Sequence, residues 1–475
     1  MSTWRTYGGW RRSRSIGLGN MDTRQTAVVL GSVMVPLLVF SIAGIEPALV
    51  FAAIALVVVP VVLVKRDGVL VTDLLAAWIG WHRARMKGET SYRGSVFQTY
   101  PRSMDLPGVL APTTILDVED PGRGRVGVVW NKATGWMSAT VLLSPAGAIL
   151  ADQATIERQV VAWGDLLAMM SDDAGICCAA ATIELQPESG TQLAEHVAGR
   201  IDPNAPQLAR EVMAQLLTTA PSRSARVSAR LTLTCDPGRS GAKTPTEGAA
   251  EVIRSLSALP VSSAGAEILR RATPGDIAGI VRRAFDPAAA NASPEQYAAL
   301  SWQDAGPIAA EESRDYYEHD GAFSATYVLL EAPLKGVPHD ILLPLLTPGA
   351  YPRRITIMYR VLSREESGMI LEREVNASAA REEYRRRTHR DATARDRADA
   401  ARAGRAAEEE ALGAGLVQFS IFVTTTVRDV NKLVDARSEI EKAARRGRLK
   451  LRLARYGQAA SFAVGLPCGI YPPAV

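Results

Sequence analysis

The longest apolar stretch of the chain lies near its start. Glu46 is the only formally charged residue over residues 25–64. Residues 25–45 and 47–64 each approach the roughly 20 apolar residues that cross a bilayer, and the Gly and Pro beside Glu46 favour a turn between them. The pattern predicts a two-helix transmembrane hairpin over residues 25–64. The alternatives are a cleaved signal peptide, for which the stretch is too long, and a buried core hairpin, in which so long a run with one charge is rare.

The next segment, residues 65–100, is predicted to be an interfacial helix and linker. Leu74, Trp78 and Trp81 lie near one face of a helix over residues 66–88, and basic residues follow. Tryptophan beside basic residues next to a span is typical of a membrane interface. We therefore expect Trp78 and Trp81 to be interfacial aromatics. The alternative is a first helix packed on the globular body.

The remaining chain alternates strand and helix patterns, which predicts an α+β fold. The two predicted domains cover residues 101–310 and 311–475. In the first we expect a hairpin at 126–143, a helix at 151–171, a strand at 175–186, helices near 191–218, a strand at 225–235 and helices within 247–287. In the second we expect strands at 322–331, 353–362, 416–427 and 447–455, a short helix around 341–346 and a helix at 429–445. The last strand-helix-strand run fits a ferredoxin-like half.

A long polar stretch interrupts the second domain. Residues 363–412 contain eleven Arg and twelve carboxylates and no Lys. Opposite charges three and four residues apart stabilise exposed helices. We expect a helical excursion that projects from the body, because apolar positions are too sparse for a coiled coil. The less favoured alternative is a nucleic-acid-binding arm.

The net charge of +4 comes from the two flanks of the apolar stretch. Residues 1–24, a basic N-terminus, and residues 65–102 carry +4 each, whereas residues 103–475 carry −3. The body therefore has no basic surplus for nucleic acid, and no direct nucleic-acid binding is expected. Basic residues favour the cytoplasmic side of spans, which predicts a multi-pass protein of the bacterial inner membrane with both termini cytoplasmic. The predicted membrane-flanking basic residues are Arg11, Arg12, Arg14, Arg24, Lys65 and Arg66.

Catalytic motifs are weak in this sequence. The four cysteines show no metal-ligand spacing and are interpreted as reduced, small apolar residues of a cytoplasmic domain. Residues 238–244 resemble a phosphate loop, but Ala242 separates the second glycine from the lysine. The acidic run 315–320 around His319 is interpreted as a polar helix end, with a divalent-metal site using Asp315, Glu318, His319 and Asp320 as the minor alternative. We therefore predict no catalytic, cofactor-binding or metal residues, no cofactor and no enzyme activity.

Several short segments carry a resemblance to a known family. They are Trp4–Arg12, the apolar hairpin, and residues 105–112, 283–287, 302–307 and 466–469. With these, the chain resembles an actinobacterial family of membrane proteins associated with type IV secretion-like conjugation clusters. Residues 20–66 are similar to the PrgI-type two-helix membrane component, and residues 100–470 to the non-catalytic amino-terminal region of conjugation ATPases.

The resemblance implies a non-enzymatic inner-membrane scaffold. Because the sequence ends at Val475, where the motor of such an ATPase would begin, we expect a separate motor ATPase as partner. The lipid bilayer is the second expected partner, and a homo-oligomer is possible. The alternatives are a membrane component of a type VII-like secretion system and a membrane-anchored metal-dependent enzyme.

Overall fold

The computed structural model combines helices with one large sheet, which agrees with the α+β class. It describes residues 23–66, 68–94, 105–122, 124–145, 151–187, 205–219, 225–291, 299–331, 337–387 and 416–471, with single positions between some of these ranges. The predicted basic residues Arg11, Arg12 and Arg14 lie outside the described residues, as does most of the excursion beyond Arg387.

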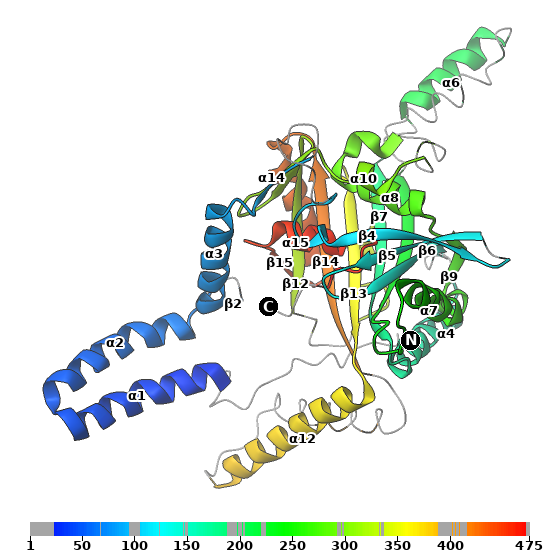
Figure 1. Ribbon diagram of the computed structural model, residues 1–475. Coiled ribbons are helices and arrows are strands. Elements are labelled where there is room, and N and C mark those ends of the chain that lie inside the picture. The colour runs from blue at the N-terminus through cyan, green and yellow to red at the C-terminus, as the bar shows by residue number, and fades with distance from the viewer. Residues whose placement is uncertain are drawn as a thin grey trace.

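The described strands include thirteen that form a single antiparallel sheet (Figure 1). Its path runs β3-β10-β11-β12-β14-β13-β7-β8-β6-β5-β4, with β15 also paired to β12 and β9 to β6. The strands are β3 (Ser91–Arg93), β4 (Thr113–Asp120), β5 (Gly124–Asn131), β6 (Met137–Pro145), β7 (Ile176–Pro187), β8 (Ala225–Cys235), β9 (Ala266–Arg271), β10 (Ala309–Glu312), β11 (Tyr317–His319), β12 (Ala322–Glu331), β13 (Arg353–Val361), β14 (Val417–Val427) and β15 (Lys450–Leu453).

The sheet contains the same arrangement twice. In a first unit, residues 113–271, a hairpin of β4 and β5 leads to β6, a helix, β7, β8, a second helix and β9. In a second unit, residues 309–453, β10 and β11 lead to β12, a helix, β13, β14, a helix and β15. The pairing orders, β7-β8-β6-β9 and β13-β14-β12-β15, correspond strand for strand. The units join where β7 pairs antiparallel with β13, with Thr182 opposite Thr356.

Each unit carries an insertion at the corresponding point, between β7 and β8 in the first unit and between β13 and β14 in the second. The insertion of the first unit contains α6 (Gln207–Thr219), and that of the second contains α12 (Arg364–Arg387). Because β7 and β13 run in opposite directions, the two insertions leave the sheet at opposite ends, as Figure 1 shows. Of the helical excursion predicted over residues 363–412, the part Arg364–Arg387 is a helix, and most of the rest lies outside the described residues.

The two faces of the sheet are covered differently. On one face α4 (Gln153–Asp172) and α7 (Pro245–Ala258) pack on the first unit, while α11 (Leu343–Leu346) and α14 (Lys432–Arg446) pack on the second. On the other face lie α8 (Pro274–Phe285), α10 (Trp302–Ala305), α15 (Gln458–Val464) and residues 465–470.

The face beneath α15 is polar although it is buried. Hydroxyl groups bond across neighbouring strands at 2.7–3.0 Å in five pairs: Ser138–Thr234, Thr140–Thr232, Thr182–Thr356, Ser324–Thr426 and Thr326–Thr424. Alternation along each strand sends many of the apolar residues to the opposite face. The covering segment therefore packs on paired hydroxyls, and Val464 also packs on the apolar side chains of Met358 and Phe422 on this face.

The N-terminal helices lie apart from the sheet (Figure 1). They are α1 (Thr23–Ala43) and α2 (Ile45–Leu63), joined at Gly44 and followed by the small β1 (Lys65–Arg66) and β2 (Val69–Leu70) ladder and by α3 (Val71–Met86). Gln25 Nε2 donates a hydrogen bond to the Val62 carbonyl at 3.0 Å, so the start of α1 lies beside the end of α2.

The predicted multi-pass arrangement is wrong. Among the described residues one helix, Gln25–Ala43, is long and apolar enough by length and composition to cross a membrane. The apolar part of α2, Ile45–Pro60, is shorter, and at 1.5 Å per residue it reaches about 24 Å, below the roughly 30 Å of a hydrocarbon core. One candidate span therefore replaces the two predicted. The prediction that both termini are cytoplasmic depended on two spans and is withdrawn with them.

The division of the body at residue 310 stays a prediction. Strands from both sides of this position belong to the same sheet. Within it, the predicted hairpin at 126–143 is confirmed by the pairing of β5 with β6, and the strand at 225–235 has the predicted bounds. The run 315–320 is not a helix end but contains β11, so the spacing of Asp315 and His319 places them on no common helical face.

Candidate functional site

Four segments far apart in the sequence meet on the second face of the sheet. Residues 105–112, 283–287, 302–307 and 466–469 all contribute to one buried apolar cluster. Together with the apolar helices α1 and α2, these are the described segments that carried the resemblance, whereas Trp4–Arg12 lies outside the described residues. The contributing side chains are Leu106, Leu110, Phe285, Trp302, Ala305, Leu466 and Cys468.

Helix α8 brings the first polar group to this cluster. Thr273 and Asp276 form a capping box at its start, with Pro274 in the first turn, and this combination fixes where the helix begins. The helix ends at Phe285, and Asp286 follows at the C-cap. Arg282 consequently stands in the last turn, where a cation is favoured by the helix dipole.

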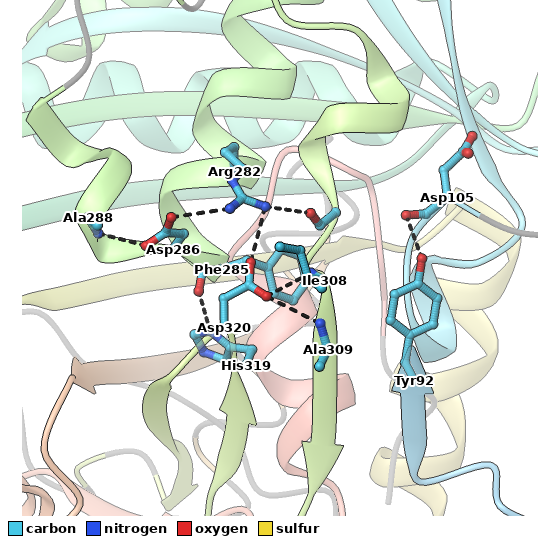
Figure 2. Close-up of polar contacts among 11 residues, drawn as sticks. Tyr92, Asp105, Arg282, Phe285, Asp286, Ala288, Ile308, Ala309, His319 and Asp320 are labelled. Atoms are coloured by element: carbon cyan, nitrogen blue, oxygen red, sulfur yellow. Dashed lines mark hydrogen bonds and ion pairs between the residues drawn. The ribbon is translucent and has the colours of Figure 1, made fainter. Parts of the chain in front are cut away.

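Arg282 joins three separate parts of the chain (Figure 2). Its guanidinium donates to the Gly306 carbonyl at 2.8 Å and pairs with Asp286 at 3.2 Å. It also lies 3.1 Å from Oδ2 of Asp320, whose side chain is largely buried. One side chain thereby links α8, the 302–307 segment and the β11–β12 turn.

Asp320 has a backbone as well as a side-chain role. Asp320 and Gly321 form the two-residue turn between β11 and β12, with φ of 45° and 73°. Two positive φ angles are characteristic of a type I′ hairpin turn, for which Asp-Gly is a preferred pair. Oδ1 of Asp320 accepts hydrogen bonds from the amides of Ile308 at 2.7 Å and Ala309 at 3.2 Å (Figure 2). The turn thus fixes the start of β10.

His319 is fully buried beside this turn and forms a directed hydrogen-bond chain. The Phe285 carbonyl can only accept, so Nδ1 carries the proton, and Nε2 accepts from the Ser324 hydroxyl at 2.8 Å. Ser324 Oγ in turn accepts from Thr426 at 2.7 Å. Burial lowers the pKa of His319 to about 4, against the opposing effect of the Phe285 carbonyl. His319 is therefore neutral at physiological pH.

The hypothetical metal site receives no support from this geometry. Both ring nitrogens of His319 are engaged, and Glu318 points to the opposite side of β11. Asp315 lies 3.4 Å from Arg455. Among the described residues no group of three or more His, Cys, Asp or Glu side chains could hold a metal ion. What the arrangement does chemically is to connect distant segments through hydrogen bonds and ion pairs.

A second buried polar group lies at the junction of the two units. Arg230 of β8 donates to Glu184 of β7 at 2.8 Å and to the Gly465 carbonyl at 2.6 Å. Arg354 of β13 lies 3.9 Å from the same carboxylate, donates to the Phe462 carbonyl at 3.2 Å, and covers the Phe462 ring. We call Glu184, Arg230 and Arg354 the seam cluster. It holds the segment after α15 against the polar face.

The charges of the seam cluster are unequal. Burial would raise the pKa of Glu184, but the two arginines lower it to about 2. Burial lowers the pKa of Arg354 to about 10, which Glu184 only partly offsets. Both pKa values fall, which favours the charged form of Glu184 and disfavours the charged form of Arg354. The reason is that two guanidiniums share one carboxylate and Arg230 is the closer to it. The positive charge of Arg354 is therefore only partly compensated.

The residues predicted to flank the membrane are placed as follows. Arg24 belongs to α1, and Lys65 and Arg66 form the exposed strand β1. Trp78 is 44% exposed, whereas the Trp81 ring lies 5.8 Å from the Tyr456 ring of the body. Both tryptophan rings also lie near the His82 ring, with centroids 5.5 and 6.4 Å from it, and their role at a membrane interface stays a prediction.

The glycine-rich stretch 238–244 lies between β8 and α7. Its amides are engaged within the stretch and its neighbours: Gly238 donates to Asp236, and Lys243 to the Glu247 carboxylate at 2.9 Å. Thr244 caps the first turn of α7. A phosphate would need these backbone amides as donors, but they already donate to two carboxylates. The geometry therefore does not resemble a phosphate-binding loop.

Sequence reasoning missed Arg282 and all three members of the seam cluster. A charged residue within an otherwise apolar strand, such as Arg230 in β8, is a signal for a buried pair, but it does not identify the partner. The Asp-Gly pair at 320–321 was the overlooked signal for the hairpin.

No protein-family model matches the chain, and no curated protein matches it.

Proposed function

We propose that the chain is a non-enzymatic scaffold, anchored to a membrane by α1, that docks a separate motor ATPase of a conjugation or type IV secretion-like system. The observation that carries the proposal is the meeting of the four motif segments in one buried apolar cluster, in which Arg282 also joins residues 283–287 to residues 302–307 and to the β11–β12 turn. Its polar groups bond to one another and to backbone, so the motifs act by fixing the positions of surfaces.

The duplicated arrangement supports a docking role. Each unit has the β-α-β-β-α-β order of a ferredoxin-like fold, and the predicted ferredoxin-like half is extended here to both units. Docking needs a surface whose supporting residues are held rigidly. The seam cluster and the Arg282 network supply that support at two places on the same face.

The membrane anchor supports the same role because it raises the effective concentration of the body beside other membrane components. A span holds the body beside other membrane-bound components, so a weak contact with a motor is made at a high effective concentration. The exposed apolar side chains of α1, such as Leu37 and Leu38 at 58% and 57%, are those a bilayer would cover.

The test is cross-linking in cells followed by identification of the captured proteins. We expect the wild-type chain to recover a motor ATPase, and its identity separates a conjugation system from a type VII-like one. Leu38→Arg should reduce recovery at least tenfold by removing the anchor, whereas the matched apolar-to-arginine change Met169→Arg, at an exposed position of α4, should not. Purified chain that hydrolyses ATP, or wild-type chain that captures no motor, would refute the proposal.

A further inference from the structure

Helix α3 has one face turned toward the body. The Trp81 ring lies 5.8 Å from the ring of Tyr456, and Asp73 acts electrostatically on Arg452 of β15. Gly68, just before α3, lies against the Leu330 side chain of β12. These contacts fix α3 beside the β12–β15 part of the sheet.

The opposite face of α3 presents apolar side chains to its surroundings. Leu75, Trp78 and Ile79 are 43–44% exposed and Met86 is 72% exposed. At 3.6 residues per turn these four lie within roughly 100° of the helix circumference. We call them the α3 stripe. His82, which stacks on Trp78 at 5.5 Å, lies on the same arc.

Basic side chains border the α3 stripe. Arg83, Arg85 and Lys87 are all exposed at the carboxyl end of the helix. The helical angles place Arg83 and Arg85 on opposite sides of the stripe. Glu89 lies 3.9 Å from Lys87 and offsets part of its charge. An apolar arc with basic borders is complementary to a bilayer surface that carries anionic headgroups.

We propose that α3 lies in the headgroup region of an anionic bilayer, with the α3 stripe toward the acyl chains and the basic side chains toward the phosphates. The inference rests on the proposed membrane anchor. Between Leu63, where α2 ends, and Val71, where α3 begins, the chain reaches at most about 27 Å, and the end of α2 lies beside the start of α1, so α3 cannot leave the neighbourhood of the anchoring helix α1. Because Trp81 holds the other face, membrane contact by α3 fixes the orientation of the sheet.

The test places an environment-sensitive dye on the stripe and on a control position. Full-length chains carry Met86→Cys, or Val161→Cys on the exposed face of α4, where Val161 is 52% exposed. The four native cysteines are buried, which restricts labelling to the new thiol. Each chain is reconstituted in vesicles of phosphatidylcholine, with or without phosphatidylglycerol, and brominated lipids are used as quenchers.

We expect brominated lipid to quench the dye at position 86 and not the dye at position 161. Replacing Arg83, Arg85 and Lys87 together by Gln should lower the ratio of lipid-inserted to water-exposed dye about a hundredfold on the anionic vesicles, since each basic side chain contributes about a factor of five. On phosphatidylcholine alone, the same replacement should have little effect.

Flotation of the vesicles separates the two ways the inference can fail. If the chain floats with the vesicles but position 86 is not quenched, the proposed contact of α3 is refuted and the anchor stands. A dye that is shielded at position 86 without lipid quenching identifies a protein surface as the occupant, which also refutes the proposal. A chain that does not float refutes the anchor and the inference with it.

Discussion

Replacing Glu184 by Gln tests whether the seam cluster holds the C-terminal segment on the sheet. The substitution preserves shape but removes the one negative charge between Arg230 and Arg354. Both arginines are at least 92% buried, as exposures of 3% and 8% show. Two cations would then face each other without a counterion beneath Gly465, whose carbonyl accepts a hydrogen bond from Arg230 at 2.6 Å.

The magnitude follows from the pKa of Glu184. It falls from 4.5 to about 2, and at about 1.4 kcal/mol per pH unit this corresponds to about 3 kcal/mol in favour of the charged carboxylate in the folded state. Removing one partner of a buried ion pair costs about 3–5 kcal/mol in other proteins. We therefore expect Glu184→Gln to destabilise the state in which the C-terminal segment is packed on the sheet by about 3 kcal/mol. This corresponds to about a hundredfold in the equilibrium constant between the packed and the detached segment.

The assay is labelling of buried thiols at constant pH, read peptide by peptide by mass spectrometry. Cys468 belongs to the segment that the seam cluster holds, and Cys235 lies in the core under α7. Both thiols are 1% exposed, so each reacts only when its surroundings open. In Glu184→Gln we expect Cys468 to react about a hundredfold faster, with a smaller change at Cys235, because the lost contacts are local.

A surface pair supplies the control. Glu331→Gln removes the partner of Lys450 at 2.9 Å, where the lysine side chain is 69% exposed, and exposed pairs contribute less than about 1 kcal/mol. The reasoning is refuted if Cys468 reacts no faster in Glu184→Gln than in wild type. It is also refuted if Glu331→Gln has an equal effect, or if Cys235 accelerates as much as Cys468.

Three further predictions concern the Arg282 network and the neighbouring His319, each checked by urea unfolding of detergent-solubilised chain. Asp320→Ala should destabilise by about 3 kcal/mol, since it removes a charged acceptor of two amides, and Asp320→Asn by less because Asn tolerates positive φ; equal losses would contradict the turn argument. Folding lowers the pKa of His319 from 6.5 to about 4, so neutral His319 contributes about 3 kcal/mol to the free energy of unfolding above pH 6.5, and this contribution is lost as the pH falls to about 4. His319→Gln should flatten this part of the profile of stability against pH. An unchanged profile would disprove that His319 is buried in its neutral form. Gly306→Ala should destabilise strongly, because its Cβ would meet the Asp105 backbone oxygen, while Gly164→Ala, in open space on α4, should stabilise by about 0.5–1 kcal/mol; similar effects would refute the close approach.

The elements that could be predicted from the sequence are long and strongly patterned. β8 alternates Val227, Leu231 and Leu233 with polar residues, and its bounds agree with the prediction. Short strands were missed for a physical reason. β9 has four consecutive exposed residues from Glu267 to Arg270, so no period of two distinguishes it from a loop. Its pairing with β6 depends on contacts that local pattern does not contain.

The site was predicted less well than the fold because its pairs are distant in sequence. Arg282 and Asp320 meet only after α8 and the β11–β12 hairpin have formed. The acidic neighbours of His319 favoured a solvated helix end, whereas alternation on β11 sends His319 inward. Local composition gave the wrong exposure, because a strand of three residues separates neighbours that a helix would group.

The duplication could not be recognised in the sequence, because the two units share the order in which their strands pair and not the lengths of their elements. Twenty residues of α4 in the first unit correspond to four of α11 in the second. The seam cluster shows why the units are nevertheless not interchangeable. The first unit contains the Arg230–Glu184 pair, while the second contributes Arg354 alone, whose guanidinium finds its carboxylate only across the β7–β13 junction. A second unit separated from the first would bury an unpaired cation or expose it, so we expect the sheet to fold as one body.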